Sequence, residues 1–151
     1  MHTFFLILHS WMRWVVILLG LWAWISAFGP FIGHKPYLPV HRRSGLLFMI
    51  SCDLQLLIGI ILYVVGGWLA GWKDMSQAMA QPAVRFFTVE HETMMIIAWI
   101  LVHVGWSRVK KAQSDRQKLS RSLVFFGIAL LLILLATPWP FREVARPWFR
   151  T

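Results

Sequence analysis

Two histidines in long apolar segments, His9 and His91, have the clearest capacity for chemistry in this sequence. An ionisable group inside a membrane-spanning segment is costly unless it is paired, so each one is a candidate functional residue. At about 1.5 Å per residue, His9 lies roughly 8 Å and His91 roughly 12 Å below the same surface. Imidazoles at similar depth on two parallel helices could bind a haem iron from opposite sides. The pair therefore predicts a b-type haem site with His9 and His91 as axial ligands.

Three further polar residues are expected beside these histidines. Arg13 follows His9 by one helical turn and points into the same sector of a bundle. It could neutralise a haem propionate or pair with Asp53 or Glu90, and the ion pair is the arrangement we expect. Gln55 or Glu90 could hold a ring nitrogen of a ligating histidine and fix its tautomer. The expected cofactor site is composed of His9, Arg13, Gln55, Glu90 and His91.

Plainer roles remain open for the same residues. A histidine in a bundle can simply hydrogen-bond a neighbouring helix, and Glu90 and Glu92 can favour the dipole at the start of one. His2 lies seven residues before His9 and returns to the same helix face. His2, His9, His91 and Glu90 could therefore bind zinc or copper instead of haem.

The remaining histidines and the one cysteine have no predicted ligand role. His103 lies twelve residues beyond His91, about 120° around the helix, and is expected near the inner interface. His34 and His41 belong to a loop region, which is a poor scaffold for a ligand. Cys52 has no second cysteine to pair with, so an intrachain disulfide or a cysteine-based metal site is excluded.

Four apolar segments must position these residues: 3–28, 45–72, 83–108 and 121–138. Each can cross a hydrocarbon layer of about 30 Å. With 58% hydrophobic and 14% charged residues, the chain of 151 residues has too little polar surface for a soluble domain. Backbone in lipid must satisfy its own hydrogen bonds, so we predict one all-α domain, an up-down bundle of four transmembrane helices. The fourth helix has no ionisable residue in its apolar run and is expected to face lipid or a neighbouring subunit.

Basic residues are concentrated in two of the predicted connections. The formal net charge is +9, but nucleic acid is not an expected partner, because nine of the fifteen basic residues flank apolar segments. Positive charge of this kind marks the cytoplasmic side and faces anionic lipid headgroups, so both termini are expected on the outer side. The nine residues are Lys35, Arg42, Arg43, Arg108, Lys110, Lys111, Arg116, Lys118 and Arg121.

Several motifs resemble those of small bacterial four-helix integral membrane proteins labelled cytochrome b. They are "LHSWMRW" (8–14), "QLLIGIILY" (55–63), "RFFTVEHETMMIIAW" (85–99) and the terminal "PWP", and the similarity spans nearly the whole chain. Its most specific elements are His9-Ser10 with Arg13-Trp14, and Glu90-His91 with Met94-Met95. The resemblance implies haem b held by membrane histidines in a multi-pass protein of the bacterial inner (cytoplasmic) membrane, with periplasmic termini. The two histidine pairs of larger two-haem cytochromes b are not present.

Two functions from different classes follow. The first is a membrane electron-transfer protein that binds haem b and works with quinol or a larger redox complex. The second is a haem-free accessory subunit of a respiratory or photosynthetic complex, or of a homo-oligomer, with its tryptophan-rich helices as contact surfaces. Nucleophilic catalysis gains no support, because Ser10 shares no helix face with the adjacent His9.

Overall fold

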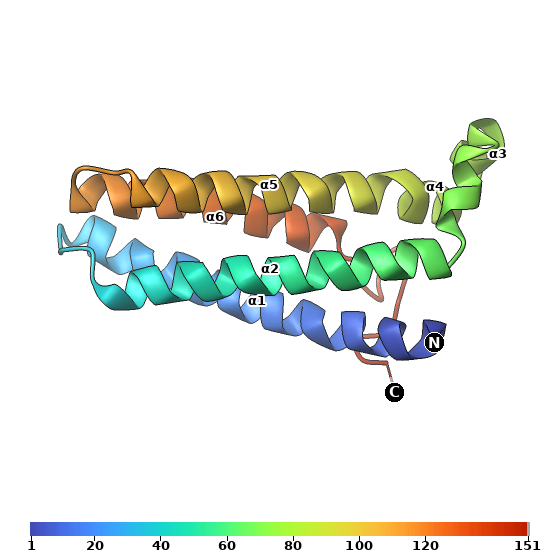
Figure 1. The fold of residues 1–151 in the computed structure, drawn as a ribbon, viewed down its shortest axis with the longest axis horizontal. Coiled ribbons are helices and arrows are strands. Elements are labelled where there is room, and N and C mark those ends of the chain that lie inside the picture. The colour runs from blue at the N-terminus through green and yellow to red at the C-terminus, as the bar shows by residue number, and fades with distance from the viewer. Residues whose placement is uncertain (151) are drawn as a thin grey trace.

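The computed structural model describes residues 1–150, which form helices joined by short connections and no strand within that range (Figure 1). Four helices are long and apolar enough to cross a membrane: His2–Ile32, Pro39–Val65, Pro82–Lys110 and Asp115–Ala136. They contain α1 (His2–Ile32), α2 (Pro39–Val65), α4 (Pro82–Arg85), α5 (His91–Lys110) and α6 (Asp115–Ala136). The predicted all-α architecture with four potential spans is therefore confirmed.

The ends of these helices differ from the predicted ends. Helix α2 stops at Val65 and not at residue 72, because Gly67 adopts a left-handed backbone (φ +77°) that ends a helix. A 3₁₀ turn, η1 (Trp68–Trp72), and a short helix, α3 (Met75–Ala80), follow. Helix α2 also starts earlier than predicted, at Pro39, where the missing N–H of proline is harmless. Hydropathy marks the lipid-facing part of a helix and not its full length.

The third span contains a local change of helix type. A π-helical turn, η2 (Phe86–Glu90), joins α4 to α5 directly before His91. A π turn inserts extra backbone and shifts the faces of the helix on either side relative to one another. His91 is thus the first residue of regular α-helix in this span.

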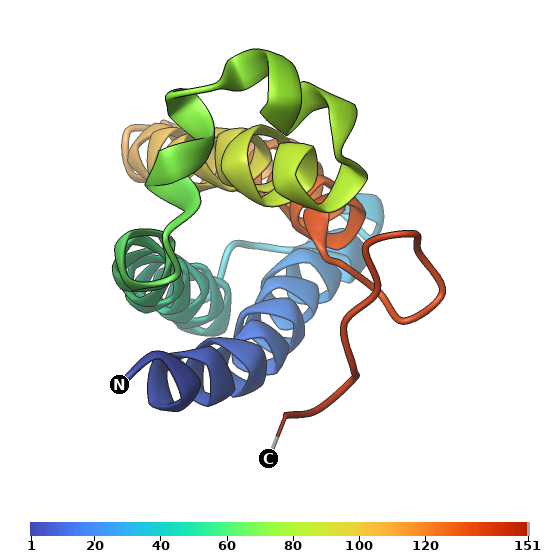
Figure 2. The ribbon, with the colours of Figure 1, turned by 90° about the vertical axis from the view of Figure 1, so that its right-hand side faces the viewer.

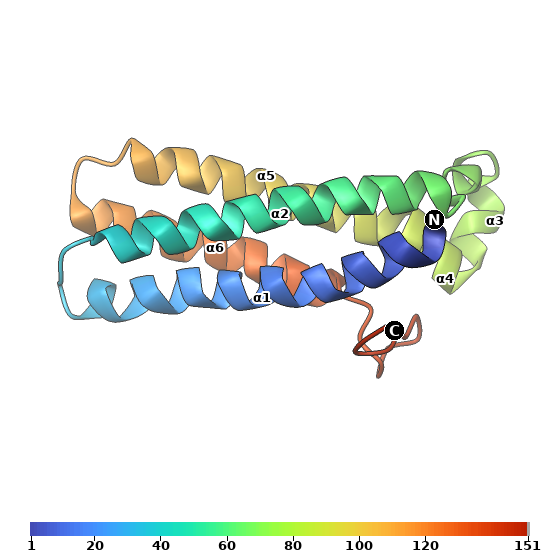
Figure 3. The same ribbon diagram turned by 60° about the horizontal axis from the view of Figure 1, so that its bottom comes forward.

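The four long helices pack in the order α1, α2, α5, α6 around the bundle. Contacts join α1 to α2, α2 to α5, α5 to α6 and α6 back to α1, as the end view shows (Figure 2). The N-terminus and the C-terminal tail (138–150) lie at one end together with η1, α3 and α4 (Figure 3). The connections 33–38 and 111–114 lie at the other end, as expected for an up-down bundle.

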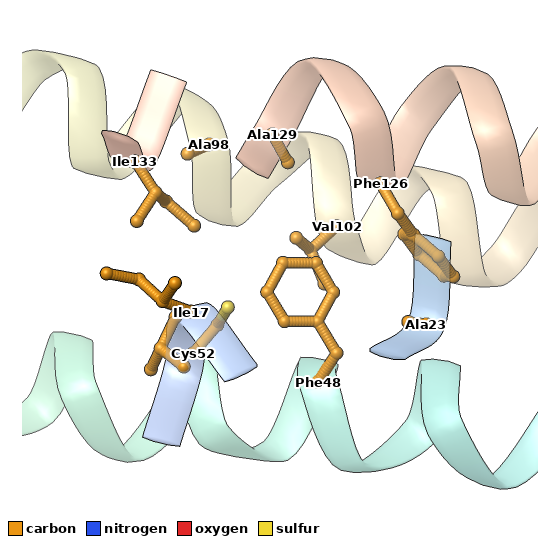
Figure 4. Packing of buried hydrophobic residues seen from close by; sticks show 10 residues of the cluster. Ile17, Ala23, Phe48, Cys52, Ala98, Val102, Phe126, Ala129 and Ile133 are labelled. Carbon is orange, nitrogen blue, oxygen red and sulfur yellow. The ribbon is translucent and has the colours of Figure 1, made fainter. Parts of the chain in front are cut away.

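The core is built from small and aromatic side chains of all four helices. Phe48 of α2 meets Phe126 of α6 edge to face, with ring centres 5.8 Å apart (Figure 4). Ala98 and Ala129 are fully buried and let the α5 and α6 backbones approach closely. The expectation that the fourth helix faces lipid or another subunit is wrong in part, because one of its faces is core. That face consists of Leu119, Ser122, Phe126, Ala129, Leu130, Ile133 and Ala136. The absence of charged residues from the apolar run of α6 therefore reflects burial in the core as much as contact with lipid.

Replacement of Gly105 by alanine tests the close approach of α5 to α6. A Cβ atom at Gly105 would overlap Phe125 of α6, so we expect Gly105→Ala to lower the free energy of unfolding by about 1–3 kcal/mol. Gly29→Ala in α1 is the matched control, because a Cβ there meets no atom within 4 Å. Thermal unfolding in detergent should show a lowered midpoint for Gly105→Ala alone. Equal midpoints for the two variants would contradict the packing.

Candidate functional site

A cavity of about 130 Å³ lies between α1, α2, α5 and the C-terminal tail. Four of the five predicted site residues line it: His9, Arg13, Gln55 and His91. Much of the remaining wall is apolar. The other lining residues are Leu6, Ser10, Val16, Cys52, Leu56, Gly59, Phe87, Glu92, Met95, Ala98, Trp99, Ile133, Thr137, Pro138, Arg146, Pro147 and Arg150. Neither the tail nor Glu92 was predicted to contribute to this site.

The two predicted histidines lie beside one another in the wall of this cavity. The ring centres of His9 and His91 are 6.4 Å apart, and the ring planes make an angle of 69°. They come from α1 and α5, helices that are not neighbours in the bundle order. The predicted proximity of the two residues is therefore observed.

His91 is held in one tautomer by a backbone contact. Its Nδ1 lies 2.8 Å from the carbonyl oxygen of Ala136 at the end of α6. A carbonyl can only accept, so Nδ1 carries the hydrogen, and the neutral ring keeps its lone pair on Nε2. Metal-ligating histidines commonly donate their second ring N–H to a carbonyl in this way. His91 is thus prepared to offer Nε2 to a metal or to a hydrogen-bond donor.

His9 is turned towards Gln55 on α2. The Gln55 amide nitrogen lies 3.3 Å from Nε2 of His9 and 3.2 Å from the His9 carbonyl oxygen, and its two hydrogens can serve both. Gly59 lies against the imidazole, since a Cβ there would make an ordinary contact of 3.4 Å with Cε1 of His9. The predicted contact between Gln55 and a candidate ligand is therefore present, with the amide as donor.

Unsatisfied polar atoms gather at the cavity. Four buried side-chain polar atoms have no hydrogen-bond partner within residues 1–150, and three of them belong to cavity residues: His9 Nδ1, Arg13 Nε and Gln55 Oε1. Buried polar groups without partners are rare and call for an explanation. A polar or metal-bearing ligand in the cavity would supply one.

Arg13 does not form the expected ion pair. Its Nη2 donates to the carbonyl oxygen of Trp148 in the tail at 2.6 Å. Trp14 donates to the same oxygen at 3.1 Å, and Trp11 donates to the carbonyl oxygen of Arg150 at 3.1 Å. The pairing of Arg13 with Asp53 or Glu90 was the wrong prediction, because the tail folds back over α1 and brings backbone acceptors within reach.

The two carboxylates expected near Arg13 have other partners. Asp53 accepts from Nε1 of Trp99 at 2.7 Å and lies 3.2 Å from Nε2 of His103. Glu90 pairs with Arg85 at 2.7 Å and is not part of the cavity wall. Glu90 ends the π turn, one residue before His91, so the two side chains point to different sides of the helix. The structure therefore does not bring Glu90 into the predicted cofactor site.

The residues at the cavity suit haem better than a zinc or copper ion. Within residues 1–150 no group of three or more His, Cys, Asp or Glu side chains could hold a metal, so the zinc or copper site is not found. Haem iron needs only two protein ligands. A ring centre lies about 3 Å from a metal bound at one of its nitrogens, so two such rings stand about 6 Å apart, close to the separation of His9 and His91.

The donor set fits haem b, but access depends on two local changes. His9 must exchange its contact with Gln55 for the iron. The cavity is also no larger than one of about 150 Å³ that holds a benzene molecule, so a porphyrin would require the cavity to widen. Three guanidinium groups, of Arg13, Arg146 and Arg150, line the same wall and could pair with propionates.

These features define a chain with four potential membrane spans and a paired-histidine cavity at one end of its bundle. No family model matches the sequence, and no curated protein or solved structure is significantly similar to it. The resemblance to proteins labelled cytochrome b therefore stays a prediction carried by its motifs.

Release of the tail tests the contacts that close the cavity. Arg13→Met removes a charge-assisted hydrogen bond, worth about 1.5–3 kcal/mol, to the tail. We expect trypsin to cut after Arg142 about ten- to a hundredfold faster, because cleavage tracks the open population. Arg121→Met is the matched control: Arg121 also donates to a backbone carbonyl, that of Arg108 at 2.6 Å, but at the other end of the bundle. Mass spectrometry of the digest measures the rate. Equal acceleration in both variants would argue against a specific clamp.

Proposed function

We propose that this chain is a b-type haem-binding membrane electron-transfer protein. The observation that carries the proposal is the pair formed by His9 and His91, whose ring centres are 6.4 Å apart in the wall of a cavity with unsatisfied polar atoms. The basic connections at the opposite end support periplasmic termini in a bacterial inner (cytoplasmic) membrane.

Each cavity residue has a separate part in this proposal. His91 would hold the haem iron through Nε2, while Ala136 fixes its ring through Nδ1. His9 would be the second iron ligand, and Gln55 holds its ring at the cavity. Arg13 would neutralise a haem propionate at the end of the cavity near the tail. The apolar wall excludes water from the space between the histidines.

Bound haem supplies a one-electron iron couple whose potential depends on its axial ligands and on burial. The chain contributes a site at one end of the bundle, within reach of the membrane surface. Quinol in the lipid or a larger redox complex is the electron partner we propose, because both meet the protein within the membrane plane.

Absorbance spectroscopy of ligand variants tests the proposal. Purified wild-type protein should show a reduced b-type spectrum with one haem per chain. His9→Ala or His91→Ala should abolish the spectrum or the stoichiometric binding of haem, because one axial ligand is lost. His103→Ala is the control, since His103 lies outside the cavity and contacts Asp53. If both cavity variants kept the spectrum and the haem content, the ligand assignment would be wrong.

A second candidate function rests on the pair of Asp53 and His103. Its side chains are 43% and 34% exposed, although Asp53 lies near the middle of α2. Nδ1 of His103 meets the carbonyl of Trp99 at 3.0 Å, so both of its ring nitrogens lie beside oxygen atoms. Ionisable residues within membrane spans almost always face the interior of a bundle or a water-filled cavity, and seldom lipid. A haem-free accessory subunit or a homo-oligomer would cover this pair with a neighbouring chain.

Purification under mild conditions separates the two candidate functions. The accessory-subunit function predicts colourless protein that co-purifies in fixed stoichiometry with larger redox subunits. Asp53→Asn should weaken that association while leaving the helix content unchanged. Coloured, haem-loaded protein that purifies alone would exclude this candidate.

A further inference from the structure

A second cleft lies at the end of the bundle opposite the histidine cavity, between the start of α2 and the end of α5. Its volume is about 430 Å³. Three basic side chains and two aromatic ones contribute to its wall, together with apolar residues. The lining residues are Tyr37, Leu38, Pro39, Arg42, Trp106, Val109, Lys110 and Lys118.

The positive charge in this cleft is largely uncompensated. No aspartate or glutamate lines it. The ion pairs among residues 1–150 are Arg85 with Glu90, His103 with Asp53, and Lys118 with Asp115. Lys118 therefore has one acidic partner, at 3.5 Å, whereas Arg42 and Lys110 have none within that range. An anion in the cleft would meet two unpaired cations.

The cleft also lies beside the ends of two potential membrane spans, where lipid headgroups are expected. It is formed where two potential membrane spans, α2 and α5, end. Aromatic side chains such as Trp106 and Tyr37 favour the boundary between hydrocarbon and headgroups. The ammonium group of Lys118 lies 5.7 Å from the centre of the Tyr37 ring, which keeps that charge beside the cleft. Apolar walls next to cations suit a ligand with both a charged and a greasy part.

We propose that this cleft binds the phosphate group of an anionic phospholipid. Arg42 and Lys110 neutralise the phosphate, and the aromatic and apolar wall receives the glycerol and the start of the acyl chains. Basic pockets between membrane helices are a recognised means of holding anionic lipids. A free phosphate ion shares the charged part of this chemistry but gains nothing from the apolar wall.

Lipid titration of the purified full chain tests the site. Native mass spectrometry in detergent would follow binding of phosphatidylglycerol, with phosphatidylcholine as the zwitterionic comparison. Each basic side chain near an anionic surface is worth about fivefold in affinity, so Arg42→Gln with Lys110→Gln should weaken phosphatidylglycerol binding about thirtyfold. Phosphatidylcholine binding should change little in the same protein.

The matched control removes the same charge from the neighbouring positions. The double variant Arg43→Gln with Lys111→Gln removes two basic side chains that are exposed like Arg42 and Lys110 but lie outside the lining. It should leave binding within about threefold of wild type, because a charge that does not meet the headgroup contributes weakly. Equal loss in both double variants would overturn the proposal, because it would indicate general surface charge. A separate titration with inorganic phosphate, read by thermal unfolding, distinguishes the source. Saturable stabilisation that requires Arg42 and Lys110, without lipid binding, would overturn the lipid assignment and leave a soluble phosphate as the ligand.

Discussion

Hydrocarbon offers no hydrogen bonds, so a polar group within it must find its partner inside the protein. Each unusual feature of this chain follows from that constraint. The backbone satisfies itself in four long helices. The imidazole of His91 uses the last turn of α6, Asp53 uses Trp99 and His103, and Arg13 uses the returning tail. Of the four buried side-chain atoms whose demand is not met within residues 1–150, three lie at one cavity, on His9, Arg13 and Gln55. The same constraint that explains the fold therefore identifies the site.

The tail is held by aromatic contacts as well as by hydrogen bonds. The rings of Trp14 and Trp148 stack with centres 6.0 Å apart, and Phe149 lies 5.6 Å from Trp14 and 5.1 Å from Trp11. Tryptophans near helix ends are usually explained by the membrane interface. Here several of them also join the end of the chain to α1. The position of the tail, and with it one wall of the cavity, thus depends on aromatic side chains that cannot ionise.

Hydropathy and depth predicted the four spans and the meeting of His9 with His91, because both depend on position along a helix axis. They did not predict the partner of Arg13. Depth gives the position of a side chain along the helix axis, but the partner also depends on the direction in which the side chain points around that axis. Asp53 has a depth similar to that of Arg13 but faces Trp99 and His103 on α5. The tail was missed for a different reason. Its contribution is made by carbonyl oxygens, which every residue has, and by a chain reversal after Pro138 that no residue pattern specifies.

The order of synthesis gives the tail a further significance. Residues 138–150 leave the ribosome after all four long helices, so the bundle can form while the wall that they supply is still missing. During that interval a large planar ligand could approach the histidine pair without displacing the tail. Once the tail has folded over α1, the same ligand is enclosed. Loading of the cavity would then be a step in the biogenesis of the protein, and loss of the ligand would be slow for as long as the tail stays in place.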